Sequence, residues 1–178
     1  MRRIFPSLLR RFRREERGSM TVEFALWFPF FLVFMYTSFE LGTLTMRHAM
    51  LERGLDIAVR DIRLGTGTAP QHDQIKTTIC DNAIVIPGCE SNLRLEMLRT
   101  DMTNWQSLPA DPDCTDRSEE VRPVRQFQPG TSNQLMLLRA CLKVRPFSPA
   151  SKLVNYLETD GAGDVSLVVT SAFVQEPR

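Results

Sequence analysis

An acidic residue stands at the head of a long apolar stretch. Glu23 is followed by sixteen residues without a charge, FALWFPFFLVFMYTSF, before the next acid, Glu40. An ionised carboxylate is costly to bury among apolar groups unless a cation accompanies it. Glu23 therefore either remains at a polar boundary, where it also stabilises the first turn of a helix, or takes a cation from a neighbouring molecule. The residue pattern leaves both interpretations open.

A source for such a cation lies just upstream. Gly18 and Ser19 precede Met-Thr-Val-Glu, and cleavage between them would leave a positively charged amino group on Ser19. Glu23 would then be the fifth residue of the mature chain, one helical turn from that amine. The carboxylate of one subunit could pair with the amine of an adjacent subunit. Such pairing would set the register between helices that stack side by side.

The first eighteen residues are strongly basic. They hold seven arginines and two glutamates, a net charge of +5, whereas the other 160 residues carry −4. Arginine-rich flanks of membrane segments stay cytoplasmic, so this asymmetry indicates membrane orientation and argues against nucleic-acid binding. The arginines nearest the apolar stretch are assigned this orienting role: Arg10, Arg11, Arg13, Arg14 and Arg17.

One long helix, about Met20 to Leu64, is predicted to follow. Its first half is apolar on all sides, and Phe24–Met46 is 23 residues long. At ~1.5 Å rise per residue this gives ~35 Å, enough to cross ~30 Å of hydrocarbon. The second half is predicted to be an amphipathic stalk, with one apolar stripe formed by Leu51, Leu55, Ala58 and Ile62. A cleaved secretory signal is the alternative, but it would be shorter and would end at a small-residue cleavage site.

The order of basic leader, Gly18, four residues, Glu23, Phe24 and apolar helix resembles that of type IV prepilins. The aromatic residue after the acid and the small Ser19 make it most similar to the Flp branch. Flp pilins are short, whereas this chain continues into a further domain. It therefore resembles the TadE-like minor pilins, or pseudopilins, of tight-adherence pilus systems. AVRDIRLG at 58–65 and the terminal SAFVQEPR are also similar to that family.

The resemblance implies a function in pilus assembly or initiation. A prepilin peptidase would cleave after Gly18, while Glu23 and Phe24 would act in subunit assembly. The implied partners are that peptidase, other minor pilins, the major Flp-type pilin, the inner-membrane assembly platform and the lipid bilayer. The protein would cross the bacterial inner membrane once, with its N-terminus cytoplasmic and its C-terminal domain periplasmic. Whether it enters the filament stays open, and a membrane-anchored periplasmic scaffold unrelated to pili is the alternative.

Three regions are thus predicted: a leader at 1–18, a transmembrane and stalk helix at 19–64, and an extracytoplasmic domain at 68–178. The domain is predicted to be α+β, with an antiparallel sheet of three or four strands packed on helix. Its expected elements are a helix at 71–83, strands at 93–97, 135–144 and 165–174, and a short helix at 151–157. Residues 104–128 are expected to form an exposed loop or an edge region, and 160–164 a turn.

All four cysteines lie downstream of the apolar stretch, on the side where disulfides persist if the arginines are cytoplasmic. Four cysteines allow three pairings. Cys80–Cys89 with Cys114–Cys141 is preferred because it closes two separate local loops. Free buried thiols are the alternative.

The other candidate sites give weaker evidence for a function. An acidic cluster could hold calcium, but it lacks the glycine and final bidentate ligand of an EF-hand, so a solvated loop is favoured; its members are Asp111, Asp113, Asp116, Glu119 and Glu120. His48 and His72 stand alone, so no metal site is predicted. Neither a Gly-x-Ser-x-Gly elbow nor a phosphate-binding glycine loop occurs. We therefore expect no enzyme, no cofactor, no small-molecule substrate and no nucleic-acid partner.

Overall fold

The structure, a computed structural model, describes residues 19–64, 71–101, 103–104, 109–115, 127–147, 157 and 159–177. The chain forms two compact units, one up to Phe39 and the other from Glu40 to Arg178. The basic leader at 1–18 and most of the helix predicted at 151–157 lie outside the described residues.

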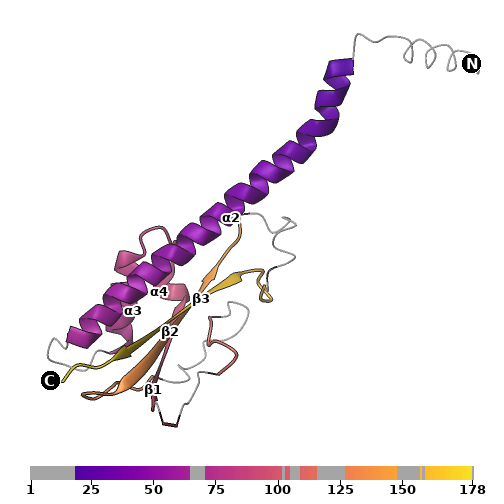
Figure 1. Cartoon of the computed structure of the whole chain (residues 1–178). Coiled ribbons are helices and arrows are strands. Elements are labelled where there is room, and N and C mark those ends of the chain that lie inside the picture. The colour runs from indigo at the N-terminus through magenta and orange to yellow at the C-terminus, as the bar shows by residue number, and fades with distance from the viewer. Residues whose placement is uncertain are drawn as a thin grey trace, which may run out of the picture. The chain divides into compact units, whose positions relative to one another are not determined.

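The long helix is present as α2, which runs from Ser19 to Leu64 (Figure 1). Its predicted apolar stripe is confirmed, because Leu51, Leu55, Ala58 and Ile62 are all buried in the hydrophobic core. The first unit contains α2 up to Phe39, and the second unit contains the remainder. The second half of α2 is therefore part of the packed domain and not a separate stalk.

The sheet has three antiparallel strands in the order β1-β2-β3. Strand β1 is Leu93–Thr100, β2 is Leu135–Val144 and β3 is Val165–Val174. Leu93 pairs with Leu142, and Val144 pairs with Val165, so β2 ends where β3 begins. With the helices beside it, this sheet confirms the predicted α+β class.

Two shorter helices pack beside the sheet and α2. Helix α3 is His72–Asn82, and α4 is Cys89–Asn92. Helix α3 begins with a capping box in which the side chains of Gln71 and Gln74 pair with each other's backbone N–H groups. It lies very close to α2, because a Cβ added at Gly54 would be 2.6 Å from the carbonyl oxygen of Ile79. Glycine permits this approach.

One face of the sheet and the helices enclose the core. Alternate residues of β2 point into it, from Met136 to Val144. The other face of β2 is also buried, although it carries Arg139, Cys141 and Lys143. Segment 109–115 covers part of that face, since Arg139 donates to the carbonyl oxygens of Pro109 at 2.7 Å and Asp111 at 3.3 Å. Both faces of the central strand are thus protected from water.

Two disulfides reinforce these contacts. The structure joins Cys80 to Cys89 and Cys114 to Cys141, the pairing preferred from the sequence. The first links α3 to α4, and the second fixes segment 109–115 to β2. Covalent links of this kind matter for a domain of this size, because they restrict the unfolded chain.

Candidate functional site

The residues predicted to act in assembly lie at the start of α2. Ser19 is its first residue, and Glu23 is its fifth, one turn further along. The first turn, Ser19–Val22, contains no acid, so Glu23 is not among the residues that cap it. Its side chain is exposed, as is that of Phe24. Gly18 and the five orienting arginines lie outside the described residues.

Phe24 begins a surface of exposed apolar side chains, which we call the apolar surface (Met20–Phe39). Phe24 is 63% exposed and Phe34 is 71% exposed. Local contacts order some of the rings, since the Phe24 and Phe28 centroids are 5.0 Å apart and those of Trp27 and Phe30 are 6.2 Å apart. A continuous exposed surface of this kind needs lipid or other protein to cover it.

Two hydroxyl groups on this part of α2 form hydrogen bonds within the helix. Thr37 Oγ1 donates to the carbonyl oxygen of Val33 at 2.9 Å, and Ser38 Oγ donates to that of Phe34 at 2.8 Å. Such bonds let polar side chains enter an apolar medium without unsatisfied donors. The helix contains Pro29, which removes one backbone donor near its beginning but does not end the helix. The surface therefore has the chemistry of a segment that meets hydrocarbon.

Among the described residues, α2 is the one helix long and apolar enough to cross a membrane. Together with the α+β unit from Glu40 onward, this defines the class of the protein. It is an α+β protein with an N-terminal helix suited to single-pass membrane anchoring.

Residues 18–60 match the family model described as TadE-like protein. The match includes Gly18, Ser19, Glu23 and Phe24, and it confirms the resemblance predicted from the sequence. Over this segment the chain is similar to the TadE-like family, which is connected with tight-adherence pilus systems. Comparison with curated proteins and with solved structures found no match.

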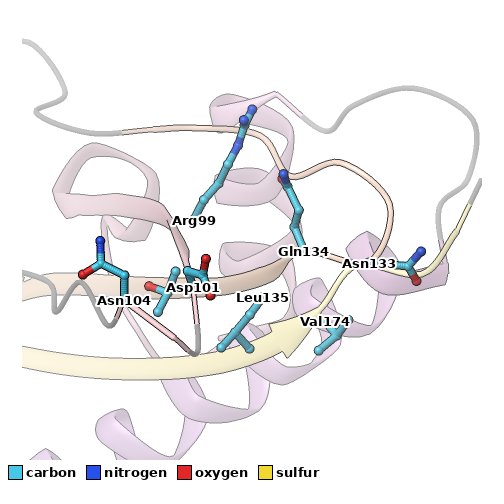
Figure 2. Close-up of a pocket in the computed structure, with 8 residues that line it drawn as sticks. Arg99, Asp101, Asn104, Asn133, Gln134, Leu135 and Val174 are labelled. Atoms are coloured by element: carbon cyan, nitrogen blue, oxygen red, sulfur yellow. The ribbon is translucent and has the colours of Figure 1, made fainter.

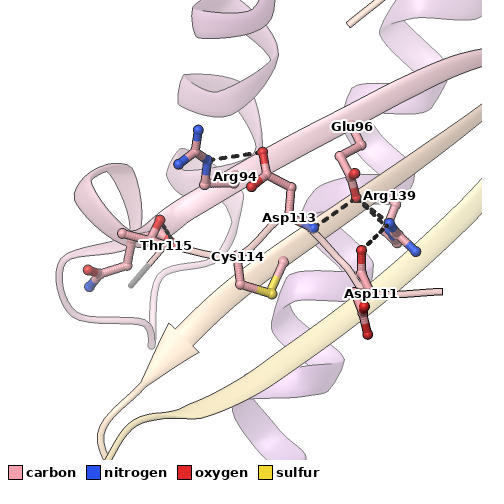
Figure 3. A network of polar contacts seen from close by, with 9 residues as sticks. Arg94, Glu96, Asp111, Asp113, Cys114, Thr115 and Arg139 are labelled. Carbon is pink, nitrogen blue, oxygen red and sulfur yellow. Dashed lines mark hydrogen bonds and ion pairs between the residues drawn. A yellow bond between two sulfur atoms is a disulfide. The ribbon is translucent and has the colours of Figure 1, made fainter. Parts of the chain in front are cut away.

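The second unit contains a buried network of charges that the sequence did not reveal (Figure 3). Glu96 Oε2 accepts hydrogen bonds from Arg139 Nε at 2.7 Å and from the backbone N–H of Asp113 at 3.2 Å. Arg94 Nε lies 3.4 Å from Asp113 Oδ2. The network bridges β1, β2 and segment 109–115, beside the Cys114–Cys141 disulfide. Its role is to hold the segment against the sheet.

The network corrects one prediction about the acidic cluster. Asp113 is only 3% exposed and pairs with Arg94, so the expectation of a solvated loop was wrong at this position. Asp111 is exposed, as expected. Asp116, Glu119 and Glu120 lie outside the described residues. Alternation along β1 places Arg94 and Glu96 on one face, and this was the signal available in the sequence.

A polar pocket of about 560 Å³ lies where β1 ends and β2 begins (Figure 2). Arg99 and Asp101 are its charged residues, with Asn104, Asn133 and Gln134 nearby. Both charged groups have internal partners. Arg99 donates Nη2 to the carbonyl oxygen of Pro129 at 2.8 Å, and hydrogen bonds from the backbone and side chain of Thr103 lower the pKa of Asp101. Both charged groups among the described lining residues thus form hydrogen bonds within the chain.

The two histidines have structural contacts. His48 Nε2 lies 3.3 Å from the carbonyl oxygen of Val168, which connects α2 with β3. His72 Nδ1 lies 2.9 Å from Asp73 Oδ1, and its ring meets Phe127 edge-on at 5.3 Å. The structure does not bring these two side chains to a common site.

Proposed function

We propose that the protein is a minor pilin, or pseudopilin, which assists the assembly or initiation of a tight-adherence type IV pilus. A prepilin peptidase would cleave it after Gly18. The observation that carries this proposal is the position of Glu23: an exposed acid in the second turn of an apolar helix, within the TadE-like segment. Cleavage would place a positive amine on Ser19, one turn away.

The physical reason for the acid is pairing between subunits. Two opposite charges ~4 Å apart attract by only ~1 kcal/mol in water, but by ~4 kcal/mol at the effective dielectric near a protein surface. Glu23 of one subunit and the Ser19 amine of another would therefore attract strongly only once the apolar surfaces have excluded water. Phe24 would supply part of that surface. The partners would be other minor pilins, the Flp-type major pilin and the inner-membrane assembly platform.

The proposed orientation follows from charge and redox chemistry. The arginines of the leader would stay cytoplasmic and hold the cleavage site at that face of the inner membrane. The unit from Glu40 onward would be periplasmic, and its two disulfides support an oxidising compartment. We also propose that the protein is a substrate of the peptidase without a catalytic activity of its own. The internal pairing of Asp101 and Asp113 supports this.

N-terminal sequencing of the protein from cells with and without prepilin peptidase tests the cleavage. The expected mature chain begins at Ser19, and Gly18→Val should leave the leader attached. Glu23→Gln should still be cleaved but should fail to support piliation. Asp56→Asn, an exposed acid further along α2, is the matched control and should behave as wild type.

Two results would contradict the proposal. One is a chain that retains residues 1–18 in the presence of the peptidase. The other is normal piliation with Glu23→Gln. If Gly18→Val and Glu23→Gln both supported normal piliation while the protein remained in the membrane, a membrane-anchored periplasmic scaffold would be the better interpretation.

A further inference from the structure

A basic pocket of about 720 Å³ lies within the unit from Glu40 onward. Arg47 of α2, Lys143 of β2 and Arg145 directly after β2 supply its charges. Uncharged polar residues complete the polar lining: Ser91, Asn92 and Thr115. Among the described residues that line it, none is acidic. The pocket is therefore suited to an anion.

The pocket keeps a positive charge after its internal pairs are considered. Lys143 Nζ lies 3.1 Å from Asp160 Oδ2, and Arg145 Nε lies 3.3 Å from Asp164 Oδ1. Arg47 instead donates Nη1 to the backbone carbonyl oxygen of Arg145 at 3.2 Å, with no described carboxylate within ion-pair distance. Three cations thus face two carboxylates. The side chain of Arg145 is also 65% exposed, which leaves the rest of its guanidinium accessible.

The pocket includes the first basic residue after the apolar stretch, Arg47. Arg47 lies seven residues beyond Glu40, where the second unit begins, and this separation is ~10 Å along α2. If the hydrocarbon ends near Glu40, the long side chain of Arg47 is within reach of the phospholipid headgroups. Arg145 lies at the same level, because it is hydrogen-bonded to Arg47.

Two exposed apolar side chains lie close in sequence to residues that line the pocket. Outside α2, the two most exposed large apolar residues in the described part of the chain are Ile84, at 87%, and Phe147, at 72%. Ile84 precedes the lining residue Pro87 by three positions, and Phe147 follows Arg145 by two. Basic groups beside exposed apolar groups are typical of surfaces that rest on a bilayer. A site for soluble phosphate would not require exposed apolar residues beside it.

We propose that this pocket binds the phosphate of an anionic phospholipid headgroup. Arg47 and Arg145 would donate charge-assisted hydrogen bonds to the phosphate oxygens. Ile84 and Phe147 would contact the acyl boundary beside it. The inference rests on the membrane anchorage in the proposed function, but not on cleavage or on the pilus. Such binding would fix the unit at the membrane surface before assembly.

Photocrosslinking of the full chain in nanodiscs tests the proposal. The nanodiscs contain phosphatidylcholine and photoactivatable phosphatidylglycerol, and the measured quantity is the lipid label on the second unit. We expect Arg47→Gln/Arg145→Gln to lower the labelling about ten-fold, as expected for loss of two charge-assisted contacts. Arg60→Gln, an exposed arginine further along α2, is the matched control and should leave it unchanged.

A second variant separates charge from folding. Arg47→Lys/Arg145→Lys keeps both positive charges and should retain most of the labelling. Equal labelling of wild type and Arg47→Gln/Arg145→Gln would overturn the inference. Competition by millimolar inorganic phosphate would also overturn it, because the pocket would then be a site for the soluble anion. A chain that alkaline carbonate removes from membranes would contradict the anchorage itself, whereas an anchored chain with unchanged labelling refutes only the lipid site.

Discussion

The two halves of α2 use the same kind of side chain in opposite ways. In the first unit, Phe24 and Phe34 are exposed along the apolar surface. In the second, Leu51 and Ile62 are buried against the sheet and the other helices. The second half finds its apolar cover within the chain, whereas the first half must receive it from lipid or from other subunits. Substitutions in the two halves should therefore affect different properties.

The two acids that bound the uncharged stretch show the same difference. Glu23 is exposed at the start of α2, and Glu40 is only 1% exposed where the second unit begins. The surroundings of Glu40 are supplied by the folded domain. Those of Glu23 are supplied by whatever covers the apolar surface. This difference is why we assign intermolecular pairing to Glu23 alone.

The sharpest test of this comparison uses two glutamate substitutions. Glu96→Gln would leave the buried cation of Arg139 without a carboxylate and should lower the free energy of unfolding by about 3–5 kcal/mol. Glu23→Gln should leave it unchanged. Pulse proteolysis of the full chain in mild detergent, over a urea series, measures both. Equal urea midpoints for the two variants would contradict the separation of roles.

A double variant identifies the source of that effect. Replacing both partners, as in Glu96→Leu/Arg139→Met, removes the buried charges together. Removing a buried ion pair as a whole is often nearly neutral, so the double variant should be more stable than Glu96→Gln. A double variant less stable than the single one would show that the hydrogen bonds to Asp113 and segment 109–115 matter more than the charges.

Two glycines of α2 offer a smaller and more local test. At Gly54, an added Cβ would lie 2.6 Å from the carbonyl oxygen of Ile79, so Gly54→Ala must push α3 away. We expect a loss of about 1–3 kcal/mol. At Gly42 an added Cβ would meet nothing within 4 Å, and Gly42→Ala should stabilise the helix by about 0.5–1 kcal/mol. The same urea series measures both, and a neutral Gly54→Ala would refute the close contact.

Periodicity was sufficient to predict most of the elements. The stripe from Leu51 to Ile62 predicted the buried side of α2, because apolar residues that recur every three or four positions over several turns lie on one side of a helix. The strands at 135–144 and 165–174 were predicted with the bounds that the structure shows. Glu23 could be selected from the sequence because an acid beside an apolar stretch is costly wherever it lies.

The buried charges could not be predicted in the same way. Asp113 lies in a segment rich in Asp and Pro, which on its own indicates exposure. Its burial depends on Arg94 and Glu96, nearly twenty residues earlier, and on Arg139 of another strand. The pocket around Arg47 likewise combines α2 with the end of β2. Contacts between residues so far apart depend on the tertiary structure. Alternation along β1 indicates that Arg94 and Glu96 share a face, but it does not indicate which residues cover that face.

The smallest expected effect concerns the turn before β3. Burial opposes ionisation of Asp160, but hydrogen bonds from the backbone N–H groups of Asp164 and Ala162, with the ammonium of Lys143, lower its pKa below the usual 3.8. A lowered pKa means that the folded state favours the ionised carboxylate. Its contribution to stability is therefore present above about pH 4 and is lost as pH falls through the folded-state pKa.

Asp160→Asn should accordingly destabilise the second unit at pH 7, and its difference from wild type should shrink as pH falls below about 4. Urea midpoints measured between neutral and acidic pH would show this convergence. Asp81→Asn, at an exposed position of α3, should follow wild type throughout. Because Asp160 pairs with a cation of the basic pocket, the variant should also strengthen the field that Lys143 presents there. A difference from wild type that stayed constant with pH would mean that Asp160 acts through its neutral hydrogen bonds and not through its charge.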